Sequence, residues 1–340
     1  MTGLDVLGCL LSQVALSATL RRHGRRRKLL NSGTERTALA RRSALVRVSR
    51  NWLLVLWTSA VIGIFLRVVP VGAQYAPAHG GSPESEEEML SEEVNDPTAM
   101  LTQVRLLDFY TPGNFQTSAQ TNAALIQPVI PVARLSFFPL EQIIRPTFRV
   151  STVATGPGSH PITALADTQL YDLLQTQWPH LDRWNLRWAI GTTFVFPTAS
   201  DRRAGANAWQ AGPAAAVLFA GVPNLLMGFL FQNPISFAYT RPGAKPQNTM
   251  LLQPGLSYSL GKGWYMKSTD SVWNVSWRHN TPTTIPVSLG FGKVWQLKGQ
   301  TLDTWTSGEW MAYRQFSRIT PMYTVRFGIN FVFPEFVFGR

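Results

Sequence analysis

The sequence predicts an all-β protein: a closed antiparallel transmembrane β-barrel of about twelve strands. Three observations predict this fold. From about residue 120 onward apolar and polar residues alternate in one segment after another, turn residues separate these segments, and many tryptophans stand at the segment ends. The mean hydropathy of −0.01 is too low for a bundle of membrane helices, but it suits a barrel, in which only every second residue faces lipid.

The last segment shows the alternation most clearly. From Tyr323 to Phe333 every second residue is apolar, whereas Thr324, Arg326 and Gly328 lie between them. Because successive side chains of a strand point to opposite faces, one face of this strand is apolar and the other is mostly polar or small. The same pattern recurs in residues 141–153, 184–197, 250–260 and 273–278.

A soluble secreted β-sandwich is the alternative, since its strands also alternate between a core face and a water face. Two features favour the barrel. The polar face mixes Arg, Gly, Ser and Asn, as expected for a wet lumen, and the apolar face is rich in Trp and Phe. Tryptophans near segment ends match the aromatic girdles of membrane barrels; they are Trp178, Trp184, Trp209, Trp264, Trp277 and Trp295.

Connection lengths give an independent estimate of the strand number. Bacterial barrels have an even number of strands, short periplasmic turns and longer outer loops. With Phe333 on the periplasmic side, residues 221–224 and 261–263 become turns, and 154–167, 198–208 and 240–249 become outer loops. This predicts twelve strands, with ten to fourteen left open, near 102–111, 121–133, 141–153, 168–178, 184–197, 209–220, 225–239, 250–260, 264–278, 284–297, 300–313 and 321–333.

A basic leader precedes the barrel. Residues 1–73 carry 12 Lys and Arg against only Asp5 and Glu35, a net charge of +10, so most of the chain's +12 lies there. Residues 74–340 carry only +2, which removes the main argument for a nucleic-acid partner. The single cysteine, Cys9, also lies in the leader, so the rest of the chain has no disulfide framework or Cys-ligated zinc.

The leader contains an export signal. Residues 52–66 are 15 apolar or small residues without a charge, preceded by Arg47 and Arg50. This is shorter than the roughly 20 residues of a membrane-spanning helix but fits the apolar core of a signal peptide. We expect cleavage after Ala73, with an uncleaved anchor as the alternative, and residues 1–45 to be an over-extended start or a disordered leader.

An acidic spacer follows the signal peptide. Residues 74–100 are rich in Pro, Gly, Ser and Glu. Such a stretch has too little apolar surface to order itself, so we expect a flexible periplasmic tail. The predicted organisation is therefore a basic leader with a signal peptide (1–73), a disordered acidic spacer (74–100) and a barrel (101–340).

Seven stretches carry a family resemblance: DPTAMLTQ (96–103), LIQPVIPV (125–132), IGTTFVFPTASD (190–201), WQAGPAAAV (209–217), LLQPGLSYSL (251–260), IPVSLGFGKVWQLKG (285–299) and VRFGINFVFP (325–334). With these, the chain between Asp96 and Phe336 resembles bacterial outer-membrane transporters of the MetA-pathway phenol-degradation type, often mislabelled neuromedin U. The resemblance implies an outer-membrane location and a transport role, without an agreed substrate or catalytic residues.

We predict no catalytic residue, cofactor or metal. Metal-ligand spacing, a phosphate-binding loop and a dinucleotide fingerprint are all absent from the sequence. A hydrolase needs a nucleophile, a base and an orienting group within mutual reach. Ser276, His279 and Asn280 could be imagined as such a set, but we interpret them as a polar strand end. A barrel hydrolase remains the weaker alternative.

The candidate site is the barrel lumen. A cation facing lipid near the midplane costs about 2–4 kcal/mol, so arginines at such positions should point inward. The candidate lumen-lining residues are Arg145, Arg149, Arg187, Arg278 and Arg326, with Asp270 and Glu309 as acidic partners. They either line a path that favours anions or polar solutes, or pair with acids and plug the lumen. Twelve strands predict a narrow or gated pore.

The sequence thus predicts an outer-membrane channel of a Gram-negative bacterium. It would pass small solutes, apolar or aromatic ones among them, by passive diffusion through the lumen, with the outer loops as gate or selector. Its expected partners are outer-membrane lipid, the solute, and the barrel-assembly machinery acting on the aromatic C-terminal strand. The alternative function is a barrel without transport, serving as an envelope scaffold or surface interaction protein.

Overall fold

The computed structural model describes residues 90–91, 93–154, 156, 160–175, 185–277, 283–297, 300–315, 319–334 and 336–338. The leader and its signal segment lie outside these residues. Within them, no helix is long and apolar enough to span a membrane. The described strands are β1 (Thr102–Asn114), β2 (Thr121–Val132), β3 (Glu141–Val153), β4 (Ile162–Leu165), β5 (Thr168–Gln175), β6 (Leu186–Phe196), β7 (Ala208–Val222), β8 (Leu225–Gln232), β9 (Ile235–Tyr239), β10 (Thr249–Gly261), β11 (Trp264–Ser268), β12 (Trp273–Ser276), β13 (Thr284–Leu297), β14 (Gln300–Arg314) and β15 (Pro321–Phe333).

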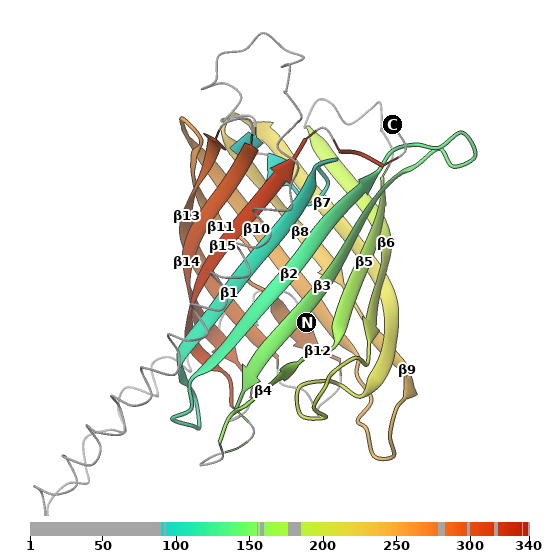
Figure 1. The fold of residues 1–340 in the computed structure, drawn as a ribbon, viewed down its shortest axis with the longest axis vertical. Helices are drawn as coiled ribbons and strands as arrows, with labels where there is room; N and C mark the ends of the chain where they lie inside the picture. The colour runs from blue at the N-terminus through green and yellow to red at the C-terminus, as the bar shows by residue number, and fades with distance from the viewer. Residues whose placement is uncertain are drawn as a thin grey trace, which may run out of the picture. The chain divides into compact units, whose positions relative to one another are not determined.

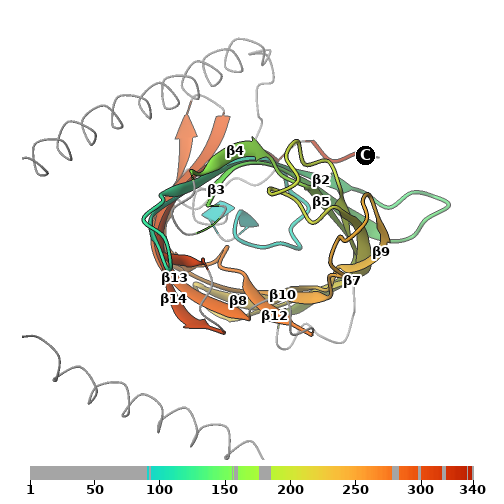
Figure 2. The same cartoon turned by 90° about the horizontal axis from the view of Figure 1, so that it is seen from below.

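These strands form one antiparallel sheet that closes into a barrel (Figure 1). The first strand pairs with the last, β1 with β15, and β8 pairs with β10. Figure 2, which looks along the barrel, shows the closed ring. Closure makes the fold viable in lipid, because an open sheet edge would leave backbone N–H and C=O groups without partners. The prediction of a closed all-β barrel is confirmed.

The wall has twelve strand positions, as predicted. The other three strands are divisions of wall strands: β9 continues β8, and β12 continues β11. β4 lies in the predicted outer loop 154–167 and precedes β5 at the same wall position, since both pair with β3. The predicted strand 225–239 is divided at Asn233 and Pro234, because proline has no N–H to donate to the ladder. The predicted strand 264–278 is divided at residues 269–272, which leave the sheet.

Short turns lie at one end of the barrel and most long connections at the other. Pro223 and Asn224 join β7 to β8, and Lys262 and Gly263 join β10 to β11. Asn224, Lys262 and Gly263 have positive φ values of 65°, 53° and 73°, which tight hairpin turns require. We call this the short-turn end; β1 begins and β15 ends here. The opposite, long-loop end carries residues 197–207 and 240–248.

The C-terminal tail stays at the short-turn end. Phe333 is the last residue of β15, and the tail then reaches the end of β2. The Phe338 carbonyl accepts the Ala133 N–H at 2.7 Å, and the Phe338 N–H donates to the Pro131 carbonyl at 3.1 Å. Phe333 thus ends the last strand, whereas Phe336 and Phe338 lie in the tail.

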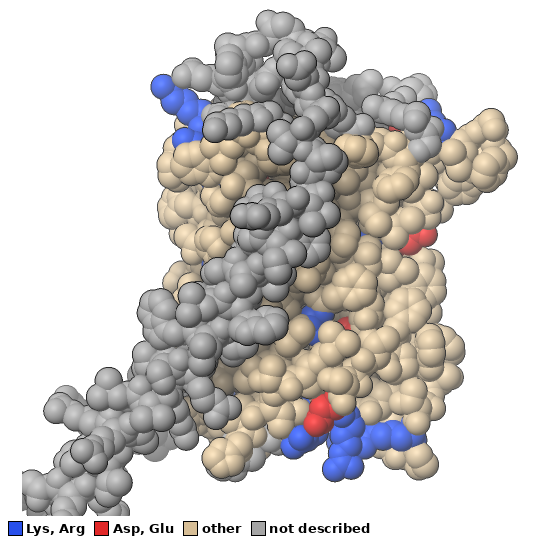
Figure 3. Space-filling view, viewed as in Figure 1, with Lys and Arg blue, Asp and Glu red and all other residues tan. Residues whose placement is uncertain are grey.

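Side chains alternate between the outside and the inside with the predicted phase. In β15, Val325 and Phe327 are 48% and 47% exposed on the outer face, whereas Arg326 between them is buried inside. In β6, Ile190 faces outward and Ala189 is buried. The outer surface is mostly uncharged, and most charged side chains visible in Figure 3 lie toward its two ends. An apolar belt around a closed barrel is the surface of a membrane-spanning protein.

Two carboxyl groups interrupt this outer belt. Asp108 on β1 accepts a hydrogen bond from the Asn122 amide at 2.7 Å. Asp172 on β5 accepts two from the Gln142 amide, at 2.9 and 2.8 Å. Their neighbours along each strand on the same face are apolar, so both acids lie within the belt. Each outward acid is thus partnered by an amide of an adjacent strand.

Candidate functional site in the barrel lumen

The inner face of the wall holds most of the buried polar side chains. Because every second residue of each strand points inward, these side chains meet across the lumen. They include Gln103, Arg105, Thr111, Gln127, Arg145, Thr147, Ser151, Ser257, Ser259, Lys267, Ser288, Asp303, Ser307, Glu309, Thr324, Arg326 and Asn330. The interior is therefore polar and charged rather than a continuous apolar core.

Asp270 is the centre of one charged cluster. Its carboxylate lies 3.0 Å from Arg105 Nη2 and 3.1 Å from Lys267 Nζ. The Gln253 amide donates to it at 3.4 Å. Asp270 reaches this position because residues 269–272 leave the wall, with Asp270 at a φ of 65°, a backbone conformation that aspartate tolerates. Two buried cations thus share one carboxylate.

Aromatic rings lie against two of the lumen cations, Arg145 and Lys267. The guanidinium carbon of Arg145 lies 4.1 Å from the ring centroid of Tyr171, and Lys267 Nζ lies 3.8 Å from that of Trp305. A cation over a ring face is attracted by the ring quadrupole. The Trp305 ring fits inside the wall because residue 328 is glycine: a Cβ at Gly328 would overlap the indole.

Asp303 is held by uncharged donors. The Tyr265 hydroxyl and the Asn330 amide each donate to it at 2.6 Å. This carboxylate therefore belongs to a hydrogen-bond network that links β11, β14 and β15. Both Asp303 carboxylate oxygens accept a hydrogen bond without a lumen cation as donor.

A second charged pair lies between β14 and β15. Arg326 donates to the Glu309 carboxylate, which also accepts the Ser271 hydroxyl at 2.7 Å. The Arg326 guanidinium lies 4.7 Å from the ring centroid of Phe109. Glu309 thus balances the charge of Arg326.

The sequence-predicted residues within the described strands occupy the inner face. Arg145, Arg149 and Arg326 share it on β3 and β15; Arg145 and Arg326 are buried, whereas Arg149 is exposed. Glu309 pairs with Arg326, as the sequence suggested. Asp270 pairs with none of the predicted arginines but with Arg105 and Lys267.

The remaining predictions concern strand ends. Arg187 lies at the start of β6, near the short-turn end, and its Nη1 is 2.6 Å from Asp96 Oδ2. Arg278 lies outside the described residues, as do His279 and Asn280 of the hydrolase alternative. Within the described part of the chain, no group of three or more His, Cys, Asp or Glu side chains could hold a metal ion.

Arg105, Lys267 and Asp303 belong to the site, but the sequence did not reveal them. In β1 the alternation is weak, because apolar Leu106 and Leu107 are adjacent and face opposite sides. The structure places Arg105 inside, where it pairs in register with the buried Asn330 of β15.

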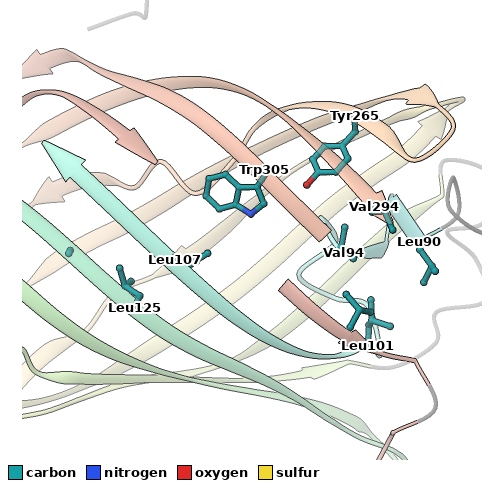
Figure 4. Packing of buried hydrophobic residues seen from close by; sticks show 10 residues of the cluster. Leu90, Val94, Leu101, Leu107, Leu125, Tyr265, Val294 and Trp305 are labelled. Atoms are coloured by element: carbon teal, nitrogen blue, oxygen red, sulfur yellow. The ribbon is translucent and has the colours of Figure 1, made fainter. Parts of the chain in front are cut away.

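Residues 90–91 and 93–101, here named the N-terminal segment, lie inside the barrel at its short-turn end. Leu90, Val94 and Leu101 are buried and belong to a cluster with Tyr265 and Trp305 (Figure 4). We expected a flexible tail up to residue 100, and the structure instead places its described last residues in the lumen. The acidic composition of 74–100 concealed the apolar side chains that pack against the wall.

Asp96 anchors this segment. Its Oδ2 pairs with Arg187, and its Oδ1 accepts the Thr98 N–H at 2.7 Å and the Thr98 hydroxyl at 2.6 Å. The Asp96 side chain is 1% exposed, whereas that of Arg187 is 47% exposed. The segment is therefore held in the lumen by one anchored carboxylate and by apolar packing.

A pocket of about 70 Å³ lies between the N-terminal segment and the wall. From the segment it is lined by Val94–Pro97 and Ala99. From the wall it is lined by Gln103, Arg105, Val129, Arg145, Tyr171, Leu218, Leu226–Leu230, Gln253, Gly255–Ser257, Lys267, Thr269 and Asp270. The pocket thus has a cationic part and an apolar part.

The wall is interrupted beside this pocket. β10 pairs with β12 up to Leu252 and with β11 from Leu256, so the ladder on this side skips Gln253–Gly255. An apolar groove of about 370 Å³ lies here, lined by Val217, Phe219, Met227–Phe229, Pro254–Leu256 and Ser268. It shares Met227, Gly228, Phe229, Gly255 and Leu256 with the lumen pocket, so the two are adjacent.

The loop between β6 and β7 contains an exposed ion pair. Arg203 donates to Asp201 through Nε at 3.0 Å and Nη2 at 2.8 Å, and its backbone N–H donates at 2.9 Å. These hydrogen bonds lower the pKa of Asp201 below its usual range and raise that of Arg203. The pair fixes the local shape of this loop at the long-loop end.

No protein-family model matches the chain, and no curated protein matches it. Several solved structures are similar, each with 10% sequence identity. An outer-membrane channel from Pseudomonas putida F1 has a TM-score of 0.49 over 70% of this chain and 99% of that one. Outer-membrane phospholipase A from Escherichia coli has 0.36 over 72% and 96%, and a FadL homologue from Pseudomonas aeruginosa 0.31 over 71% and 93%. Likenesses of this size assign the chain to no family.

Proposed function

We propose that the protein is a channel in the outer membrane of a Gram-negative bacterium, through which small solutes diffuse passively. The observation that carries the proposal is a polar, charged lumen occupied by the chain's own N-terminal segment. The anchor of this segment, Asp96, pairs with a half-exposed arginine and not with a buried one. A gated channel requires a polar lumen and a segment that blocks it reversibly. An envelope scaffold requires neither a polar lumen nor a blocking segment.

The proposal places the short-turn end in the periplasm. β1 begins and β15 ends at the short-turn end, so both ends of the barrel lie on one side of the membrane. Bacterial barrels carry their short turns on the periplasmic side. The assembly machinery would then read the aromatic end of β15 from the periplasm. Residues 197–207 and 240–248 would face the outside and form the entrance.

The solutes in this proposal include apolar and aromatic ones. Tyr171, Tyr265 and Trp305 present rings to the lumen, and an apolar groove lies at the break in the wall. Such solutes are also what the resemblance to the phenol-degradation type of transporter implies. The path would pass Arg145, Arg149 and Arg326, with Arg187 at its periplasmic end.

Single-channel conductance in planar bilayers tests the proposal. We expect the intact protein to conduct weakly, and deletion of residues 90–100 or the substitution Asp96→Asn to raise the conductance severalfold. Asp201→Asn, which removes an ion pair in an outer loop, is the control and should change little. If the deletion variant inserts as a heat-modifiable barrel but conducts no better than the intact protein, the segment is no gate and the proposal fails.

A further inference from the structure

We propose that the pocket beneath the N-terminal segment binds the carboxylate group of a small organic acid, with the acid's apolar body against the wall. The inference rests on the channel function proposed above, because it names the class of solute that the lumen would select.

Arg145 is the central residue of the proposed site. Its side chain faces the pocket, it is 8% exposed, and its guanidinium lies against the Tyr171 ring. Among the described residues it has neither an ion pair nor a hydrogen bond, and its buried Nε has no partner. A buried cation without a partner is costly, since it has lost its water and gained no anion in return. An arginine kept in this state points to an anion that arrives from outside the chain.

The other charges lining the pocket leave Arg145 unbalanced. Asp270 is shared by Arg105 and Lys267, at 3.0 and 3.1 Å. Asp96, the second acid of the lining, is paired with Arg187. The pocket therefore holds three cations around one available carboxylate. Its electrostatic field favours a further negative charge.

The size and shape of the pocket favour a carboxylate. Its volume of about 70 Å³ admits only a small ligand. The planar guanidinium offers two parallel N–H donors that match the two oxygens of a carboxylate. A phosphate dianion is bulkier and would need more donors than one free arginine supplies.

The apolar part of the lining indicates what the head group is attached to. The buried side chains of Leu226 and Leu230 line the pocket on the wall side, next to the break in the wall. An aromatic ring or a short alkyl chain can lie there while its carboxylate reaches Arg145. The ligand class is thus an amphipathic monocarboxylate.

Calorimetric binding to the full-length protein purified in detergent micelles tests this inference. The probes are benzoate, benzyl alcohol of similar shape without the charge, and inorganic phosphate. We expect benzoate to bind more tightly than either of the others. Arg145→Gln should weaken benzoate binding at least about tenfold, the effect of losing a charged hydrogen-bonded pair. Benzyl alcohol binding should not change.

Arg134→Gln is the control. Arg134 follows β2, pairs with Glu141 at 3.6 Å and does not line the pocket, so benzoate should bind this variant as it binds the parent protein. Heat-modifiable gel mobility verifies that each variant is folded, and loss of an unpaired buried cation should not destabilise the barrel. Equal binding of benzoate and benzyl alcohol, equal loss in both variants, or tighter binding of phosphate would overturn the inference. Because binding in micelles requires no conductance, a failed channel measurement and a failed binding measurement remain distinguishable.

Discussion

Lumen side chains differ in how their charge is balanced. Glu309 balances Arg326, and Asp270 balances two cations at once, whereas Arg145 and Arg149 have no acidic partner among the described residues. The described inner face therefore carries more positive than negative charge. If the lumen conducts, this excess predicts a preference for anions, which a reversal-potential measurement in a salt gradient would detect.

Asp270→Asn should both destabilise the barrel and strengthen its anion preference. Without the carboxylate, Arg105 and Lys267 become unpaired cations that are almost fully buried, and breaking such a pair costs about 3 kcal/mol. Denaturant unfolding in micelles measures the first effect and the reversal potential the second. Asp201→Asn, whose partner is exposed, should leave both quantities unchanged. An unchanged unfolding curve for Asp270→Asn would show that lumen water screens these charges.

Strands β14 and β15 pack through the pairing of a tryptophan, Trp305, with a glycine, Gly328. Trp305 points into the lumen and is 2% exposed, which no girdle residue would be. It fits because Gly328 on β15 is paired with it and has no Cβ. The ring belongs to the same buried cluster as Leu90 and Val94 of the N-terminal segment, so the glycine at position 328 supports the packing of this cluster.

Gly328→Ala should displace the Trp305 ring and destabilise the barrel by about 1–3 kcal/mol, the usual cost of overpacking. The loss is measured by unfolding in micelles and should be accompanied by weaker docking of the N-terminal segment, seen as faster proteolysis near residue 94. Gly308→Ala is the control, because its Cβ would meet only ordinary contacts at 3.6 Å. Equal stability of the two variants would contradict this account of the packing.

The barrel contacts membrane lipid through its apolar outer belt. Outward aromatic and aliphatic side chains surround the wall, and Asp108 interrupts them at the middle of β1. In water such a carboxylate is harmless, but on a lipid-facing wall it costs free energy. The position therefore distinguishes a membrane barrel from a soluble one by experiment.

Asp108→Leu should stabilise the protein in lipid vesicles by about 1 kcal/mol, since it removes a polar group from the belt. The converse substitution Phe327→Asp, at the position paired with Asp108 on β15, should destabilise it. Unfolding of vesicle-embedded protein measures both. Should Asp108→Leu instead destabilise the barrel, the bond from Asn122 would outweigh the cost of the exposed acid.

The alternation of residues along the chain was enough to predict a closed barrel, twelve wall positions and which side chains of β6, β10 and β15 face outward. This pattern is local: a strand turns successive side chains to opposite faces wherever it pairs, so period and phase can be read without knowing its neighbours. Prolines and turn residues marked most of the strand ends for the same reason.

Only the tertiary structure decided where the N-terminal segment lies and which charges meet in the lumen. Arg105 and Asp270 are separated by 165 residues and meet because the wall is interrupted at 269–272. Such pairings depend on how strands are staggered around the ring and on segments that leave it, and neither leaves a periodic trace in the sequence. The residues of the candidate pocket are brought together by closure of the barrel, which no short stretch of the chain encodes.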